Sequence, residues 1–172
     1  MSASASQLRR PLGRRLQARV FRVINVPVRV LLGLPFPTPA GRRLMLLYLT
    51  GRKTGRRYRQ PVSYITDGDT LLTPGGGRWK LNLVDGQPVR VRLRGRLVYA
   101  VPEIISDPDQ VQQLLELMAS ASPTVKRFVA VPRQSDGHFD RERLQTAIGY
   151  GFRIIRWHLQ GKVARESVSA PR

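Results

Sequence analysis

The pattern of apolar and polar positions divides the chain into a basic front segment and a region of strands. Over residues 8–26, apolar residues recur at helical spacing while arginines fill most positions between them, which predicts a basic amphipathic helix. Apolar residues continue over 28–34, and prolines at positions 35, 37 and 39 then indicate a linker. We therefore expect a helix and a Pro-rich linker over residues 8–40, after a disordered lead at 1–7.

Beyond the linker, the pattern predicts β structure. Segments with the apolar or alternating character typical of strands are residues 44–50, 57–66, 70–73, 89–94, 96–102 and 152–159. The Asp67-Gly68-Asp69 sequence predicts a hairpin turn, and Gly95 predicts a second one. Because residues 89–94 alternate Val or Leu with Arg, the second hairpin should have one apolar face and one arginine face.

Helices are expected after the second hairpin. Asp107 directly precedes Pro108, the order of an N-cap and a first helical residue, and this predicts a helix over 108–120. A short helix should follow Pro123, and another should cover 139–148. About six antiparallel strands with flanking helices indicate the α+β class and a small barrel over 41–160, followed by a polar tail at 161–172.

The distribution of charge along the chain predicts a negatively charged binding partner. The chain of 172 residues has 30 Lys and Arg against 11 Asp and Glu, and its first acidic residue is Asp67. An arginine-rich codon usage would explain scattered arginines but not the missing acids. The front of the protein should therefore contact lipid head groups, a phosphorylated cofactor or nucleic acid.

The basic helix is expected to lie on an anionic membrane surface. Arg22 and Arg29 interrupt its apolar stretch, so it does not cross a membrane. We expect residues 8–34 to be dispensable for folding; in the alternative, apolar residues of the helix cap the open end of the barrel. The arginine-rich, acid-free start also fits an organellar transit peptide, and Arg9-Arg10 superficially fits a twin-arginine signal. The missing uninterrupted apolar region and cleavage site argue against secretion. The expected location is cytoplasmic and peripheral to the membrane.

Several kinds of site are excluded or disfavoured by composition. The chain has no cysteine, which excludes disulfides, thiolate metal sites and a cysteine nucleophile. His138 and His158 have no carboxylate cluster near them in the sequence, so a zinc site is not expected.

The segment from Thr50 to Arg59 is the first candidate for binding chemistry. It is a turn between two predicted strands, with Gly51 and Gly55 at its ends and cationic and hydroxyl side chains between and after them. Glycines let backbone amides converge on an anion, and Arg and Lys add charge-assisted hydrogen bonds. A strand follows rather than a helix, so this is a phosphate-binding turn of another kind than the nucleotide P-loop; the alternative is a solvated basic hairpin.

The second candidate lies where the chain leaves the next strand. Gly75, Gly76 and Gly77 permit close backbone approach to a flat ligand, and Trp79 and Asn82 then share one face of a short helix. Trp79 would serve equally as a core anchor.

These motifs, in this order, resemble the deazaflavin-dependent nitroreductase family. The resemblance covers Gly-Arg-Lys-Thr-Gly, Tyr-Arg-x-Pro-Val, the Asp-Gly-Asp turn, the Gly-rich exit and Trp-x-x-Asn-Leu, and runs from about Gly41 to Arg96. It implies a split β-barrel related to flavin-reductase barrels. It also implies a reduced deazaflavin coenzyme (coenzyme F-420, 8-hydroxy-5-deazaflavin) as hydride donor, and an N-terminus that associates with membranes in some members.

The resemblance also implies which residues bind the coenzyme. In the family, the cationic turn binds the phosphate and tail of the coenzyme, and the residues that match it are Gly51, Arg52, Lys53, Thr54, Gly55, Tyr58 and Arg59. The Gly-rich exit from the following strand binds the ring of the coenzyme, and the residues that match it are Gly75, Gly76, Gly77, Trp79, Asn82 and Leu83. Many members have a longer stretch before the tryptophan, whereas only Arg78 separates Gly77 from Trp79 here.

The resemblance implies an oxidoreductase that passes hydride to a quinone, a nitro compound or an activated double bond of a small, apolar substrate. FMN is the alternative coenzyme, because it also presents a phosphate and a flat ring. A second class of function is a non-catalytic barrel that binds anionic lipid or nucleic acid through the arginines at 90, 92, 94 and 96. Aromatic residues are too sparse there for specific nucleic-acid binding. Related barrels form homodimers, so a homodimer is a further expectation.

Overall fold

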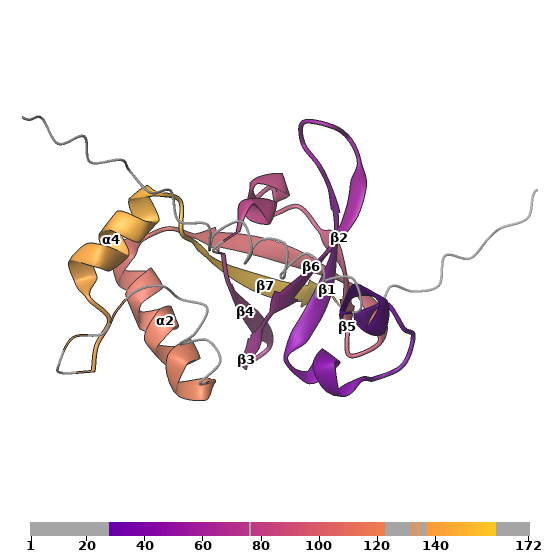
Figure 1. Cartoon of the computed structure of the whole chain (residues 1–172), viewed down its shortest axis with the longest axis horizontal. Coiled ribbons are helices and arrows are strands. Elements are labelled where there is room, and N and C mark those ends of the chain that lie inside the picture. Colours follow the sequence, from indigo (N-terminus) through magenta and orange to yellow (C-terminus); the bar gives the residue numbers. More distant parts are fainter. Residues whose placement is uncertain (1–27, 76, 123–131, 133, 135–136, 161–172) are drawn as a thin grey trace, which may run out of the picture.

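The described part of the chain is a curled antiparallel sheet with two helices packed beside it (Figure 1). A computed structural model describes residues 28–75, 77–122, 132, 134 and 137–160. The strands are β1 (Leu44–Thr50), β2 (Arg57–Ser63), β3 (Ile65–Asp67), β4 (Thr70–Pro74), β5 (Val89–Leu93), β6 (Arg96–Ile105) and β7 (Ile154–Gln160). The helices are η1 (Pro39–Arg42), η2 (Arg78–Asn82), α2 (Pro108–Ala121) and α4 (Arg141–Gly149).

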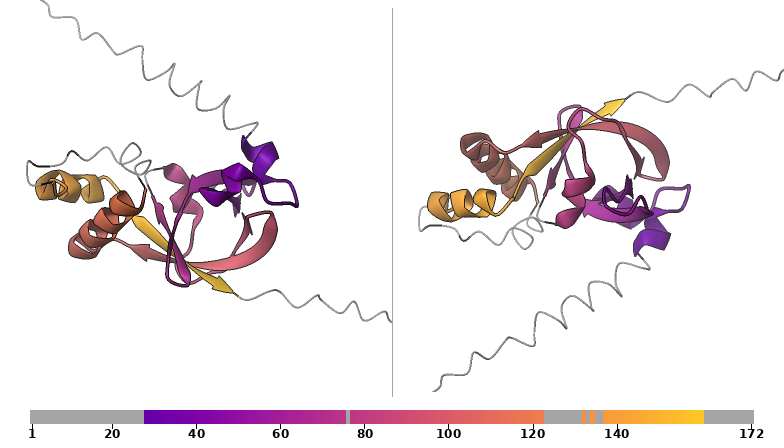
Figure 2. Two further views of the ribbon diagram at one scale, coloured as in Figure 1. Left: turned by 90° about the horizontal axis from the view of Figure 1, so that it is seen from below. Right: turned by 90° about the horizontal axis from the view of Figure 1, so that it is seen from above.

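The sheet has the strand order β2-β1-β5-β6-β7-β4-β3, with every neighbouring pair antiparallel. Figure 2 shows that the sheet bends around an interior, with α2 and α4 together at one end. The predicted α+β class and split-barrel fold are confirmed. Strand β1 is central to the candidate site, because it pairs with β2 on one side and with β5 on the other.

The interior contains two apolar clusters. The barrel cluster includes Leu47, Val91 and Trp157, all fully buried. The Trp157 indole Nε1 donates to Thr73 Oγ1 at 3.1 Å, so the polar atom of this large buried side chain is satisfied. The second cluster joins the apolar faces of α2 and α4 to the sheet through residues such as Leu72 and Ile154.

Side-chain caps explain where both α-helices begin. Asp107 Oδ1 accepts from Gln110 N at 2.9 Å, which confirms the predicted cap of α2. Asp140 Oδ1 accepts from Arg143 N at 3.0 Å, so α4 begins at Arg141 and not at position 139 as predicted. The Asp140 cap is a local signal in the sequence, of the same kind as Asp107.

The prediction of one continuous strand over residues 57–66 is wrong. The strand breaks at Tyr64, which lies between β2 and β3 and is buried. Its backbone N–H donates to Arg43 O at 3.1 Å, and its hydroxyl donates to Gly41 O at 2.9 Å. Because of these contacts the chain changes its pairing partner at Tyr64: β2 pairs with β1, whereas β3 pairs with β4. The sheet therefore has seven strands and not about six. The last strand also begins at Ile154, two residues later than predicted.

The segment before β1 packs against the barrel. Residues 28–32 are helical and Leu32 is buried. The turn between β5 and β6 has positive φ at Arg94 (49°) and Gly95 (81°), the combination of a type I′ hairpin turn. A Cβ atom at Gly95 would lie 2.5 Å from the carbonyl carbon of Phe36, so only glycine allows the turn and the segment to touch.

The remaining predictions for the termini fall on residues outside the described ones. These are the lead at 1–7, most of the basic helix, the helix after Pro123 and the tail at 161–172. Among the described helices, none is long and apolar enough to cross a membrane. The described residues also contain no cluster of three or more His, Asp or Glu that could hold a metal ion.

A charged cluster on β6 and β7 predicts a pH-dependent contribution to stability. Glu103 contacts His158 Nε2 at 2.8 Å and accepts from Arg156 Nη1 at 3.3 Å. The hydrogen bond with His158, and then the charge of Arg156, lower the pKa of Glu103 although burial opposes them. The stabilisation is therefore present above the usual carboxyl pKa near 4.5 and is lost as the pH falls through the lower folded value.

We expect Glu103→Gln to lower the free energy of unfolding by about 0.5 kcal/mol at neutral pH, because the cluster is half-exposed. The difference from the wild type should disappear in acid. Urea unfolding at neutral pH and at about pH 3 measures both values. An equal difference at the two pH values would contradict the assignment to the Glu103 charge.

Candidate functional site

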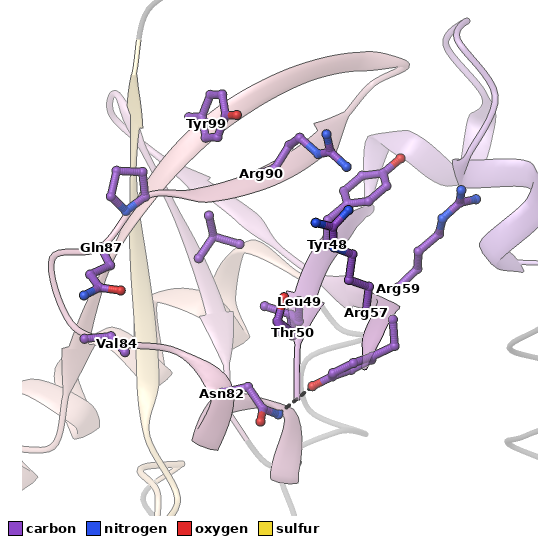
Figure 3. Close-up of a pocket in the computed structure, with 13 residues that line it drawn as sticks. Tyr48, Leu49, Thr50, Arg57, Arg59, Asn82, Val84, Gln87, Arg90 and Tyr99 are labelled. Carbon is purple, nitrogen blue, oxygen red and sulfur yellow. Dashed lines mark hydrogen bonds between the residues drawn. The ribbon is translucent and has the colours of Figure 1, made fainter. Parts of the chain in front are cut away.

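A cleft of about 700 Å³ lies where β1 ends and where β2 and β5 begin (Figure 3). It is lined by Tyr48, Leu49, Thr50, Arg57, Tyr58, Arg59, Asn82, Val84, Gln87, Pro88, Val89, Arg90 and Tyr99. The lining includes three arginines and no carboxylate. Such a cleft concentrates positive potential and attracts an anionic ligand.

A row of alternating cationic and aromatic side chains crosses the sheet along one side of this cleft. The strand registers place Tyr48 opposite Arg59 on β2 and opposite Arg90 on β5, and Arg90 in turn lies opposite Tyr99 on β6. Directly opposed residues in antiparallel strands point to the same face. The row Arg59, Tyr48, Arg90, Tyr99 therefore follows from the strand order alone.

The Tyr48 ring is held in place by its neighbours. The guanidinium carbon of Arg90 lies 4.8 Å from the ring centroid and that of Arg59 lies 5.5 Å from it, both within cation–π range. In the view of Figure 3 these two arginines flank the ring. Arg92 Nε also donates to the Tyr48 hydroxyl at 3.3 Å. Stacked guanidinium groups keep their N–H donors directed away from the ring, where an anion can accept from them.

The predicted arginine face of β5 is present but is not a free array of cations. Val91 is buried between Arg90 and Arg92, as the alternation predicted. Arg92 Nη1, however, donates to Gly95 O at 3.1 Å and to Leu34 O at 3.5 Å. Arg94 Nε donates to the Tyr64 hydroxyl at 3.2 Å. Of the three arginines at 90, 92 and 94, only Arg90 lines the cleft.

The turn between β1 and β2 carries the glycine-bounded cationic motif. Gly51 N donates to Arg56 O at 2.9 Å, and Gly55 N donates to Gly51 O at 2.7 Å, which closes the turn. Gly55 has a φ of +64°, a conformation that favours glycine. The side chains of Lys53 and Thr54 are exposed. The turn adjoins the cleft, because the strand residues that flank it belong to the cleft lining.

The Gly-rich exit packs tightly against the protein itself. A Cβ atom at Gly75 would lie 2.8 Å from Arg153 O, and one at Gly77 would lie 2.6 Å from Trp79 Cδ1. Trp79 is partly buried and packs against the barrel cluster. The interpretation of Trp79 as a core anchor is therefore supported. The space beside Gly75 and Gly77 is therefore occupied by atoms of Arg153 and Trp79.

Lys80 fixes the start of η2. Its Nζ donates to Gly77 O at 2.9 Å. Burial, with a smaller effect of the nearby Arg153 charge, lowers the pKa of Lys80. This lysine is thus part of the scaffold beneath the exit.

Asn82 joins the two motifs. Its Oδ1 accepts from Arg52 N at 2.9 Å, and its Nδ2 donates to the Tyr58 hydroxyl at 2.6 Å and to Trp79 O at 3.2 Å. One side chain therefore connects the cationic turn, the start of β2 and η2. Burial raises the pKa of Tyr58, against a smaller lowering by the hydrogen bond from Asn82, so its hydroxyl stays protonated at neutral pH.

The structure brings part of the predicted site together. Among the residues predicted to bind the coenzyme, Tyr58, Arg59 and Asn82 line the cleft, and Arg52 is linked to them through Asn82. The other turn residues, Gly51, Lys53, Thr54 and Gly55, lie in the adjoining turn. Gly75, Gly77, Trp79 and the buried Leu83 lie outside the cleft lining, and Gly76 lies outside the described residues.

The sequence analysis did not assign Tyr48 or Tyr99 to the site, and it placed Arg90 only on the arginine face of the alternative, non-catalytic function. Tyr48, Arg90 and Tyr99 reach the cleft from three strands whose pairing is not readable from the sequence. A usable signal was present in β1, where Tyr48 is the one residue with a polar group inside an apolar run.

The chain belongs to the F420H(2)-dependent quinone reductase family, whose model matches residues 14–133. This confirms the family that the sequence motifs indicated.

Two solved structures are similar to the chain at 14% identity and a TM-score of 0.44 each. One is described as a "domain-swapped dimer" and the match covers 84% of this chain and 98% of that chain. The other is the "Structure of F420-H2 Dependent Reductase (FDR-A)", with 67% of this chain and 94% of that chain covered. No protein of curated function matches the chain.

Proposed function

We propose that the protein is a deazaflavin-dependent oxidoreductase that passes hydride from reduced coenzyme F-420 to a quinone, a nitro compound or an activated double bond. The observation that carries the proposal is the link through Asn82 between the glycine-bounded turn and η2, beside a cationic cleft. The family to which the chain belongs supports the same coenzyme.

The donor set of the cleft fits a coenzyme with a phosphate and a ring. Arg57, Arg59 and Arg90 supply charge-assisted donors, and no carboxylate in the lining opposes them. Tyr48 orients two of these cations, Arg59 and Arg90, which stack on its ring. When bound in its reduced form, the coenzyme supplies the hydride, while the protein supplies binding and orientation.

We assign the phosphate or acidic tail to the turn residues with Tyr58 and Arg59. The assignment of the ring to Gly75, Gly76, Gly77, Trp79, Asn82 and Leu83 is supported by the resemblance of the sequence motifs, and Asn82 is the described member of this set that lines the cleft. Leu49, Val84 and Val89 make part of the cleft apolar, which suits a small apolar substrate beside the ring and reduces access of water to it.

The test is an absorbance titration of the purified protein with coenzyme F-420 and, separately, with FMN. We expect saturable binding of the deazaflavin and oxidation of its reduced form when a quinone is added. Tighter binding of FMN would favour the alternative coenzyme. Binding of neither would contradict the proposal and favour the non-catalytic barrel.

We also propose a cytoplasmic location and peripheral contact with anionic membranes through the basic segment at residues 8–34; because Leu32 is buried in the fold, the contact is assigned to its first part, residues 8–27. The support is the charge pattern: this stretch has several arginines and no Asp or Glu. Removal of residues 1–27 should abolish sedimentation of the protein with anionic vesicles.

A further inference from the structure

A second cavity, of about 650 Å³, lies where the segment before β1 meets the turn between β5 and β6. It is lined by Pro37, Thr38, Pro39, Arg42 and Arg94, and it shares none of these residues with the cleft described above. Its described lining contains two arginines and no carboxylate. The volume is in the range of ligand sites, and the positive charge suits an anion.

Backbone contacts hold the two arginines of this cavity next to each other. A Cβ atom at Gly41 would lie 3.5 Å from Arg94 Cα, so the residue before Arg42 contacts the turn between β5 and β6. Gly41 N in turn donates to Thr38 Oγ1 at 3.3 Å, and Thr38 is buried. Because the prolines on both sides of Thr38 have a fixed φ, the conformation of this wall is further restricted before a ligand binds.

The guanidinium groups keep most of their donors for a ligand. Arg94 Nε donates to the hydroxyl of Tyr64 at 3.2 Å, and the same hydroxyl donates to Gly41 O at 2.9 Å. This contact orients the guanidinium, while the donors on its two terminal nitrogens have no partner within the described part of the chain. Arg42 is exposed, and no described residue accepts a hydrogen bond from its side chain. Two adjacent guanidinium groups with free donors are suited to the oxygens of a phosphate group.

The backbone of Arg94 is an independent indication that its side chain has a function. Among the described residues, Arg94 is the only one other than glycine with a positive φ, at 49°. Residues with a Cβ atom rarely adopt this conformation, and Asn is the residue preferred before Gly in a type I′ turn. An arginine is therefore unfavourable for the backbone here, and such strain is typical of positions at which the side chain is needed.

We propose that Arg42 and Arg94 form a second anion site, separate from the cleft, that binds a phosphate group with two negative charges. A lipid head group such as that of phosphatidic acid presents this group, and so does a soluble phosphate ester. Phe36 precedes the cavity lining in the chain and is 54% exposed, so a lipid would also find an apolar contact there. The site does not involve the coenzyme, and the proposal does not rest on the proposed function.

The decisive variant is Arg94→Asn, because it removes the guanidinium and places at the turn a residue that the backbone conformation favours. We expect it to unfold at a temperature close to that of the wild type, since the relief of backbone strain offsets the lost hydrogen bond to Tyr64. Its affinity for inorganic phosphate at this site should fall about tenfold or more, because charged donors are lost. Arg96→Asn is the matched control: it makes the same change on the same hairpin, and Arg96 is exposed and outside the cavity lining.

The measurement is a titration of the full chain with inorganic phosphate at fixed, low salt, followed through backbone amide signals in NMR spectra. The signals of Gly41 and Gly95 report on the second site, and those of Gly51 and Gly55 report on the turn beside the cleft. In the wild type and in Arg96→Asn, the Gly41 and Gly95 signals should shift saturably. In Arg94→Asn these shifts should need at least tenfold more phosphate, while the response of Gly51 and Gly55 should be unchanged.

Two results would overturn the proposal. One is the absence of a saturable shift at Gly41 and Gly95 in the wild type. The other is an equal loss of affinity in Arg94→Asn and Arg96→Asn, which would indicate general attraction by positive charge. A lack of response at Gly51 and Gly55, with saturable shifts at Gly41 and Gly95, would count against the proposed function and leave the second site standing.

A vesicle experiment identifies the source of the phosphate group. Neutral phosphatidylcholine vesicles carry either phosphatidic acid or phosphatidylserine at equal total negative charge. If the ligand is a lipid head group, Arg94→Asn should reduce sedimentation with phosphatidic acid more than with phosphatidylserine. If phosphate binding depends on Arg94 but sedimentation does not, the ligand is a soluble phosphate ester, and the proposed anion site stands in both cases.

Discussion

Replacement of both Lys53 and Arg59 by Ala is expected to weaken coenzyme binding by tens-fold or more. Arg59 lines the cleft and stacks on Tyr48, while Lys53 projects from the exposed turn beside it. A hydrogen bond to a charged group contributes about 1.5 to 3 kcal/mol, and about 1.4 kcal/mol corresponds to a factor of ten. Two such contacts therefore have a large combined effect, which the dissociation constant at fixed salt measures.

A general loss of positive charge must be separated from the loss of these two contacts. Arg141 and Arg143 lie on α4, away from the cleft lining, and are exposed. Replacement of both by Ala removes the same formal charge and should change coenzyme affinity little. An unchanged dissociation constant in the Lys53 and Arg59 variant, or an equal loss in the α4 variant, would refute the assignment of the phosphate or tail to the turn.

The strands could be predicted because burial follows local alternation. In β5, Val91 is buried while Arg90 is exposed, so the alternation of Val and Arg in the sequence identifies the buried and the exposed face of the strand. The helix caps are equally local, since Asp107 and Asp140 bond within three residues of themselves. Tyr64 could not be placed in this way. Its role at the break between β2 and β3 depends on contacts with Gly41 and Arg43, which are distant in sequence.

The candidate site shows the same division between local and distant information. Both motifs were visible in the sequence, but their junction is a contact between Tyr58 and Asn82, 24 residues apart. The row from Arg59 to Tyr99 needs the pairing of β1 with β5, which lie some forty residues apart and are adjacent only in the folded sheet. Of the thirteen residues that line the cleft, local patterns therefore pointed to Tyr58, Arg59 and Asn82, and the strand pairing brings Tyr48, Arg90 and Tyr99 beside them.

Truncation of the chain should show that the segment before β1 belongs to the fold. The sequence predicted that residues 8–34 are dispensable, but Leu32 is buried and Leu34 O accepts from Arg92. A chain that begins at Gly41 loses these contacts and the packing of Phe36 on Gly95. Burial of one leucine contributes about 1.5 to 3 kcal/mol, so we expect the free energy of unfolding to fall by roughly 2 to 4 kcal/mol.

A chain that begins at Val28 is the matched control, because it keeps every one of these contacts. It should unfold at the temperature of the full chain, whereas the chain from Gly41 should unfold roughly 5 to 15 °C lower, a range set by the size of the domain. Leu32→Ala in the full chain tests one of these contacts without truncation and should cost about 1.5 to 3 kcal/mol, less than the truncation from Gly41. If the chain from Gly41 unfolds at the wild-type temperature, residues 28–40 do not stabilise the barrel. If the chain from Val28 is less stable than the full chain, residues 1–27 contribute to the stability of the fold. That result would support the alternative in which the basic helix caps the barrel.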